Sequence, residues 1–138
     1  MIQSHYHALV EALIRKLRAA PNLAALVNAQ FTTQPSSMTH LPYVLFESVS
    51  ARDLSLDGDS CMELKLQIHI VTDGTYLGQA EYGAELLMQS LKDRQLTLDR
   101  PFRCADLWIE KLSFARVKGP SNRATLQLKS IVEIINGV

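Results

Sequence analysis

The chain has 138 residues, of which 47% are hydrophobic and 20% are charged, and this composition predicts one folded domain spanning residues 1–138 and argues against intrinsic disorder. Fourteen Lys and Arg residues balance fourteen Asp and Glu residues, so no overall field draws the chain to nucleic acid or anionic lipid. No apolar run approaches the roughly 20 residues that span a bilayer, and the amino terminus lacks the continuous apolar segment of a signal peptide. We therefore expect a cytoplasmic protein without a membrane partner.

Apolar residues near the amino terminus recur at the spacing of one helical face. They are Ile2, Tyr6, Leu9, Val10, Leu13, Ile14 and Leu17. This pattern predicts an amphipathic helix from Ile2 to Leu17, which Pro21 ends because proline cannot donate the helical hydrogen bond. A second short helical turn is expected from Leu23 to Val27. The polar stretch from Phe31 to Pro42 is interpreted as an irregular surface connection.

Two strands are predicted next. Tyr43 to Ser50 is dense in β-forming residues, and the segment Ala51 to Ser60, with an Asp57-Gly58 turn signal, separates it from the second strand. That strand runs from Met62 to Ile70 with strict alternation. One face carries Met62, Leu64, Leu66, Ile68 and Ile70, and the other carries Glu63, Lys65, Gln67 and His69.

The second half of the chain predicts one helix and two strands. The helix starts after Asp73 or Thr75 and runs from Leu77 to about Arg94. The strand from Leu107 to Val117 has Trp108, Leu112 and Phe114 on one face and Leu107, Ile109, Ala115 and Val117 on the other. A polar turn joins it to a strand from Arg123 to Ile135. The fold class is α+β, in the order α-β-β-α-β-β, with two main helices on one face of a four-stranded, mostly antiparallel sheet.

Residues capable of catalysis or metal binding do not form a recognisable motif. Cys61 and Cys104 have no neighbouring Cys or His at ligand spacing, and a cytoplasmic chain is not expected to hold a disulfide. His5 and His7 point to different sides of a helix, and all four histidines, with His40 and His69, are interpreted as solvated.

One loop bears a partial likeness to a calcium-binding loop. Asp53, Ser55, Asp57 and Gly58 match the first half of an EF-hand loop. Leu64 occupies the position of the closing Glu, and a strand follows where a helix should, so we expect a hydrated loop without metal. Neither a nucleophile elbow nor a phosphate-binding loop occurs. The sequence predicts no enzyme and no cofactor.

Several short segments, taken in this order, resemble one family. They are Leu41-Pro42-Tyr43-Val44, Glu47-Ser48-Val49-Ser50-Ala51-Arg52-Asp53, the Asp57-Gly58 loop, Gly78-Gln79-Ala80-Glu81 and Ala115-Arg116-Val117. The chain is similar over most of its length to the tail-completion proteins, also called tail terminators, of long-tailed phages, prophages and gene transfer agents. It differs at His69-Ile70-Val71-Thr72, where members carry an aromatic residue, and in the loop Gln30 to His40.

The resemblance implies a structural subunit that assembles with itself into a ring, a hexamer, on the end of a tail tube. Its other partners would be the tail-tube protein and a head-completion or connector protein, and DNA would pass without sequence-specific binding. The subunit would be cytoplasmic during assembly and part of the virion tail afterwards. Candidate assembly or lumen contacts are Arg52, Asp53, Asp57, Arg116, Lys118 and Arg123.

Two other functions stay open from the sequence. A small ligand-binding or regulatory α+β module would need a pocket between the helices and the sheet. An enzyme would need a converging acid and base, and the loop from Ala51 to Ser60 is where we would expect them. The scattered cations Lys65, Arg116, Lys118, Arg123 and Lys129 suit passage of DNA better than its capture.

Overall fold

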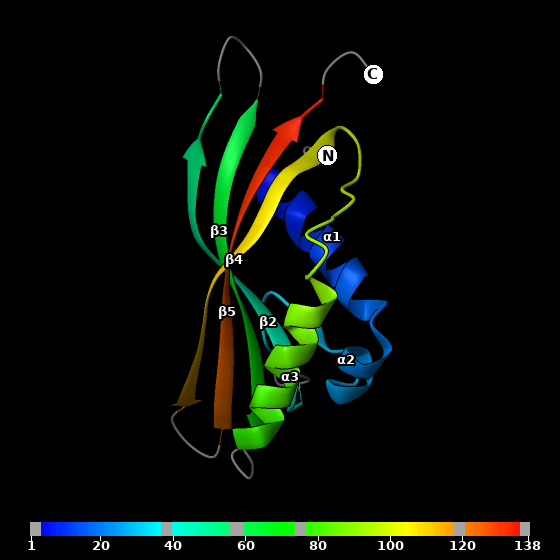
Figure 1. Ribbon diagram of the computed structural model, residues 1–138, viewed down its shortest axis with the longest axis vertical. Helices are drawn as coiled ribbons and strands as arrows, with labels where there is room; N and C mark the ends of the chain where they lie inside the picture. The colour runs from blue at the N-terminus through cyan, green and yellow to red at the C-terminus, as the bar shows by residue number, and fades with distance from the viewer. Residues whose placement is uncertain (1–3, 37–39, 56–59, 74–76, 118–120, 136–138) are drawn as a thin grey trace.

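Three helices cover one face of a five-stranded sheet in the computed structural model, which describes residues 4–36, 40–55, 60–73, 77–117 and 121–135 (Figure 1). The elements in chain order are α1 (His5–Arg18), α2 (Pro21–Leu26), β1 (Phe31–Thr32), β2 (Tyr43–Asp53), β3 (Cys61–Asp73), α3 (Leu77–Ser90), β4 (Phe102–Val117) and β5 (Ser121–Ile134).

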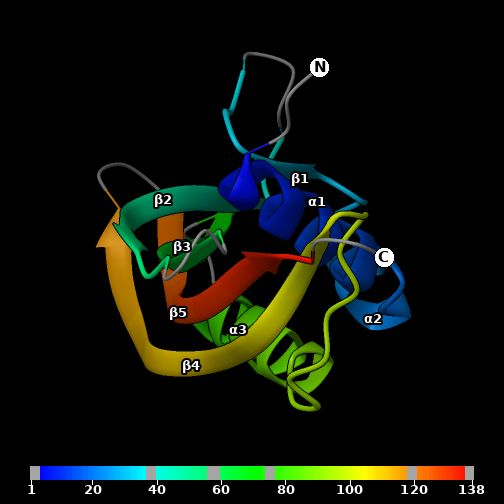
Figure 2. The same ribbon diagram turned by 90° about the horizontal axis from the view of Figure 1, so that it is seen from above.

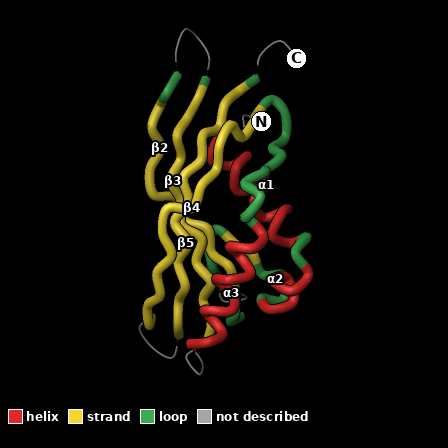
Figure 3. The backbone as a smooth tube through the Cα atoms, in the orientation of Figure 1, coloured by secondary structure: helices red, strands yellow, loops and turns green. Residues whose placement is uncertain are grey.

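The sheet has the strand order β1-β2-β3-β5-β4. β2, β3, β5 and β4 pair antiparallel, and only β1 is parallel to its neighbour. The strands are strongly twisted, so Figures 2 and 3 show them fanning apart while the helices stay on one side. The opposite side of the sheet, called here the open face, carries none of the three helices.

The core lies between the helices and the sheet. Leu9, Leu13 and Leu17 of α1 are fully buried, as the predicted stripe requires, and they join the inward row of β3. In that row Leu66, Ile68 and Ile70 are fully buried, which confirms the alternation predicted for this strand. Ser4 caps α1 by accepting a hydrogen bond from the backbone N–H of His7 at 3.0 Å, satisfying one free donor of the first turn.

The α+β class, the antiparallel pairing and the helices on one face are confirmed, but the expected count of four strands is wrong. Phe31 and Thr32, placed in an irregular connection by the sequence, pair with Val44 and Leu45 as β1. Gln30 stabilises the pairing of β1 with β2, because its side chain donates a hydrogen bond to the C=O of His40 and accepts one from the His40 N–H. A two-residue strand has no periodicity of its own and depends on this long-range pairing.

The predicted boundaries also change. β2 extends to Asp53, β3 covers Cys61–Asp73, and β4 begins at Phe102 instead of Leu107, because cross-strand pairing continues the ladders through polar residues that carry no strand signal. α2 begins at Pro21, the favoured first helical position. α3 ends at Ser90 and not near Arg94, whose φ of 57° is left-handed.

The predicted faces of the fourth strand need a correction. A register shift lies between Ile109 and Lys111, where one extra residue reverses the alternation. As a result Leu112 packs against the core together with Leu107 and Ile109, whereas the simple alternation grouped Leu112 with Trp108. Phe114 opposes the buried Ala124 and follows Leu112 onto the helix-bearing face.

Candidate functional site

Of the six contact residues predicted from the sequence, the structure places three side chains, at opposite ends of the sheet. Arg52 and Asp53 are the last residues of β2 at one end, whereas Arg123 lies near the start of β5, at the other end. The part of β3 between these ends spans about 30 Å. Asp57 and Lys118 lie outside the described residues, and for Arg116 only the backbone in β4 is described.

At the first end, Arg52 and Asp53 point to different faces. Arg52 opposes Glu63 on the open face, and its Nη2 lies 2.8 Å from Glu63 Oε2. Asp53 accepts the backbone N–H of Ser55 at 2.8 Å, and its hydrogen bonds with Ser55 lower the pKa of this exposed carboxyl. The Ser55 Oγ in turn accepts the Cys61 N–H at 3.0 Å. These bonds fix the ends of β2 and β3 with respect to each other.

At the second end, polar atoms are buried without a partner. Arg123 Nε and Asn122 Nδ2 have no hydrogen-bond acceptor among the described atoms. Most buried polar groups of folded proteins are satisfied, so this end of the sheet differs from the first.

Both lateral edges of the sheet are largely unpaired in the described chain. β1 pairs with Val44 and Leu45 only, which leaves the outer backbone edge of β2 open over residues 46–53. β4 pairs with β5 on one side and is the last strand of the sheet. Open edges expose backbone N–H and C=O groups that can pair with another chain.

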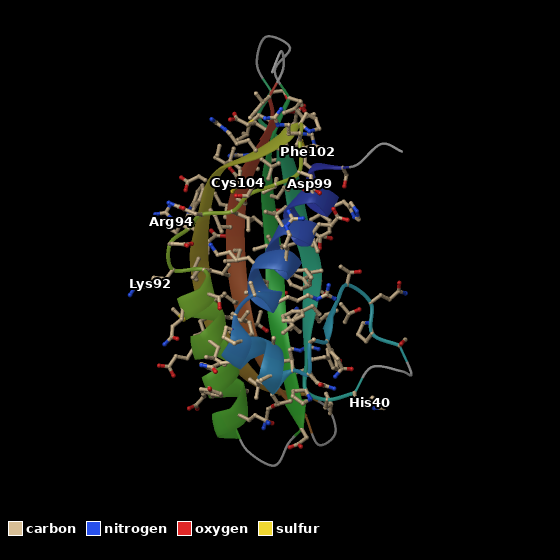
Figure 4. The ribbon with its side chains drawn as sticks, turned by 90° about the vertical axis from the view of Figure 1, so that its right-hand side faces the viewer. His40, Lys92, Arg94, Asp99, Phe102 and Cys104 are labelled. Atoms are coloured by element: carbon tan, nitrogen blue, oxygen red, sulfur yellow. The ribbon has the colours of Figure 1, made fainter. Side chains whose placement is uncertain are left out.

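Exposed apolar side chains accompany the edges. Val49, which is 49% exposed at a register shift of β2, and Leu41 lie on the β2 side. Phe114, 45% exposed, lies on β4, and Tyr82 and Met88 are exposed on α3. Figure 4 shows His40 and Arg94 at opposite edges of the molecule, marking the β2 and β4 sides. Sequence reasoning missed these residues because it placed Val49 and Phe114 within strands without knowing which strands are outermost.

The expectation that His69, on the open face, is solvated is wrong. His69 is 3% exposed and not solvated, because it lies on the central strand between Leu45 and Thr125. Its Nδ1 is 2.8 Å from Thr125 Oγ1, and its Nε2 is 3.2 Å from Glu47 Oε1. Burial lowers the pKa of His69, outweighing the hydrogen bond with Glu47 that raises it.

His5 is also half-buried, although the sequence placed it at the surface. Its ring packs edge-on against Phe102 at 5.2 Å between centroids, and its Nε2 lies 3.0 Å from Ser60 Oγ. Burial lowers the pKa of His5, because the charged imidazole is less well solvated there. His7 and His40 are exposed, as expected.

The described residues do not assemble a chemical centre. Cys61 and Cys104 are half-buried free thiols, and burial raises the pKa of each, which keeps them protonated and weakly nucleophilic. Within the described ranges, no three metal-ligating side chains form a group. None of the helices described has the length and apolar character needed to cross a bilayer.

The hollows in the described part of the chain lie on its surface. A hollow of about 550 Å³ is lined by Glu11, Ile14, Arg15 and Arg18 of α1 with Asp99, on the helix-bearing side shown in Figure 4. Core side chains occupy most of the space between the helices and the sheet. Where the end of α3 meets β4, an open hollow of about 430 Å³ is lined by residues that include Met88, Leu91, Trp108 and Ile109.

Comparisons with known proteins agree with this architecture. The family model described as "Tail completion protein gp17" matches residues 11–133. A chain of the virion of a native gene transfer agent particle superimposes with a TM-score of 0.81 at 25% identity, covering 96% of this chain and 99% of that one. The gp17 protein of bacteriophage SPP1 gives a TM-score of 0.57 at 20% identity, covering 95% and 91%. No curated protein matches the sequence.

Proposed function

The chain belongs to the tail completion protein gp17 family, a family of structural proteins and not of enzymes, and from that premise we propose that copies of it close into a ring, a hexamer, that ends a virion tail tube and helps to join it to the head. The membership confirms the resemblance drawn from the sequence and makes the protein a tail component. The ring and its partners are the proposed part.

One observation carries the proposal: the two open edges of the sheet are unlike each other and run in opposite directions. β2 is antiparallel to β3, β3 to β5, and β5 to β4, so β2 and β4 are themselves antiparallel. The β4 edge of one copy can therefore meet the β2 edge of the next as another antiparallel pair. Such head-to-tail contacts form a ring when the rotation closes.

The exposed apolar residues support the same contact. Val49 and Leu41 on the β2 side, and Phe114 with Tyr82 and Met88 on the β4 side, are exposed in the single chain. Pairing unlike edges would bury both sets at once. Apolar patches exposed on a subunit mark surfaces for interaction.

Joining the sheets edge to edge determines where the ends of each sheet would lie in the ring. Strands joined edge to edge run along a barrel at a tilt to its axis, so the ends of the sheet face the two openings of the ring. Arg52 and Asp53 then lie at one opening, and Arg123 lies near the other. We assign these two groups to contacts with the tail-tube protein and the head-side connector, and the open face to the passage for DNA.

A ligand-binding module is less well supported, because the space between the helices and the sheet holds core side chains in the described part of the chain. The ring is tested by replacing Phe114 with Lys, which places a charge on the β4 edge. The expected result is loss of rings by light scattering and negative-stain microscopy, for the chain alone and with its tail tubes.

The matched control is Asn22→Lys, which adds the same charge at an exposed site of α2 and should leave assembly unchanged. Circular dichroism should show that both variants are folded. The proposal is wrong if the unmodified chain stays monomeric both alone and with tail tubes, or if Phe114→Lys assembles as well as the control.

A further inference from the structure

Two lysines on the open face lie directly opposite each other. Lys65 of β3 pairs with Lys129 of β5, so their Cβ atoms are about 5 Å apart, and like charges at this spacing destabilise a sheet. Among the described residues, no carboxylate forms an ion pair with Lys65. Lys129 Nζ reaches only Glu63, at 4.0 Å. The fold therefore keeps an unfavourable pair near the middle of an open surface.

The acidic groups of this face bond mostly to side chains other than Lys65. Glu63 lies 2.8 Å from Arg52, Glu133 pairs with Arg103, and Glu47 bonds to His69. Lys111 of β4, one step along the same face at the Gln127 position, also forms no ion pair with a described residue. In and beside these rows the four cations Arg52, Lys65, Lys111 and Lys129 outnumber the three carboxylates Glu47, Glu63 and Glu110 by one, so a small positive excess remains near the middle of the open face, although the chain as a whole is neutral.

An aromatic ring and two amides complete this region. Trp108 opposes Lys129 on β4, and Lys129 Nζ lies 4.9 Å from the centre of its ring. Gln67 and Gln127, directly opposite each other on β3 and β5, are half-buried beside the lysines. We call Lys65, Lys111, Lys129, Gln67, Gln127 and Trp108 the cationic band. It offers ammonium and amide donors in neighbouring rows, a chemistry suited to phosphate oxygens.

We propose that the cationic band contacts the phosphate backbone of duplex DNA inside the ring. The inference rests on the proposed ring, in which each copy presents the band toward the same passage and produces a circular belt of cations. DNA fits the band better than an acidic protein does, because the exposed large apolar side chains that could be buried against a protein lie near the sheet edges and on α3, outside the band. A few cations per subunit give a salt-sensitive contact without sequence preference.

The test uses Lys65→Gln in the full chain with short duplex DNA at low salt. Fluorescence anisotropy should show weaker binding than the unmodified chain. The slope of log K against log salt should fall by roughly 1 per removed cation in contact with phosphate. The melting temperature should rise by on the order of 1–3 °C, because the like-charge pair is gone.

Trp108 provides a readout that places the DNA. It is the single tryptophan of the chain, so DNA binding at the cationic band should change its emission. The matched control is Arg100→Gln, which removes one exposed positive charge from the connection before β4. This control should bind DNA with the affinity and the Trp108 response of the unmodified chain.

The outcomes separate this proposal from the ring itself. Three results would each overturn the proposal that the cationic band contacts DNA. They are DNA binding that leaves Trp108 emission unchanged, equal DNA binding by Lys65→Gln and the control, and the absence of DNA binding at low salt. Binding of an acidic protein at Trp108 in place of DNA would do the same. Ring formation is measured separately, by light scattering and negative-stain microscopy. A chain that binds DNA at Trp108 but stays monomeric both alone and with tail tubes would support the cationic band and reject the ring.

Discussion

His69 shows how its position in the sheet changes the burial and the pKa of a single residue. It is polar and falls on the polar side of an alternating strand, yet it is buried and bonded on both ring nitrogens, to Thr125 and Glu47. Burial disfavours its charged form, as does the nearby Arg123, while Glu47 favours it. The net effect is a folded-state pKa below the ordinary 6.5.

The sign of this shift predicts how stability depends on pH. A lowered pKa means that the folded state binds the proton more weakly than the unfolded state, so the contribution of His69 is present above about pH 6.5 and is lost below it. We expect the free energy of unfolding, from urea melts, to fall between about pH 7.5 and pH 5.5. His69→Gln should reduce that fall, and His40→Gln, at an exposed histidine, should not. An equal fall in His69→Gln and the unmodified chain would contradict this account.

At the scale of elements, α3 lies close to β3 at a glycine. A Cβ added to Gly83 would lie 2.7 Å from Ile70 Cδ1 and 3.2 Å from Leu26 Cδ2. Because Ile70 is fully buried, its side chain has little room to move away. The glycine therefore sets the distance between the helix and the sheet, which no helical pattern in the sequence reveals.

Replacing this glycine tests the close approach. Gly83→Ala gains about 1 kcal/mol of helix propensity but overpacks the core at a cost of about 1–3 kcal/mol, so we expect a net loss of stability on the order of 1 kcal/mol. Gly78→Ala on the same helix is the control, because its added Cβ meets no atom within 4 Å and should stabilise by up to about 1 kcal/mol. Urea unfolding measures both. Stabilisation by both changes would show that the side chains around Ile70 rearrange at little cost, and it would contradict the expected overpacking.

At the scale of the whole molecule, the important feature is that the two sheet edges differ. β2 is covered by β1 over two residues, whereas β4 is a 16-residue strand at the end of the sheet. An assembly that joins unlike edges uses two different surfaces on each copy. Blocking one surface leaves the other intact.

This asymmetry predicts the result of a mixing experiment. Val49→Lys blocks the β2 edge and Phe114→Lys blocks the β4 edge, so neither variant alone should form rings where the unmodified chain does. When they are mixed, the intact β4 edge of the first meets the intact β2 edge of the second, and growth stops there. Light scattering should give twice the 15.4 kDa mass of one chain. A contact between like edges would instead let one of the single variants dimerise alone, and the head-to-tail contact would be rejected.

Features that depend on local periodicity could be predicted from the order of the residues alone. The apolar stripe ending at Leu17 and the alternation from Leu64 to Ile70 dictate which faces are buried, because side-chain direction in helices and strands repeats over a few residues. The α+β class and the helices on one face followed from these patterns. The family resemblance was carried by short segments of the sequence, and it implied a structural role.

Features that depend on pairing between distant segments could not be predicted in this way and were seen first in the folded chain. Phe31 becomes a strand through Val44, Leu112 turns toward the core through a bulge opposite β5, and Lys65 meets Lys129 across 64 positions of the chain. Register, bulges and edge position arise from hydrogen bonds between strands, which no window along a single strand contains. For the same reason Arg52 and Asp53 were found at one end of the sheet and Arg123 near the other, and the open edges became visible only once the strand order was known.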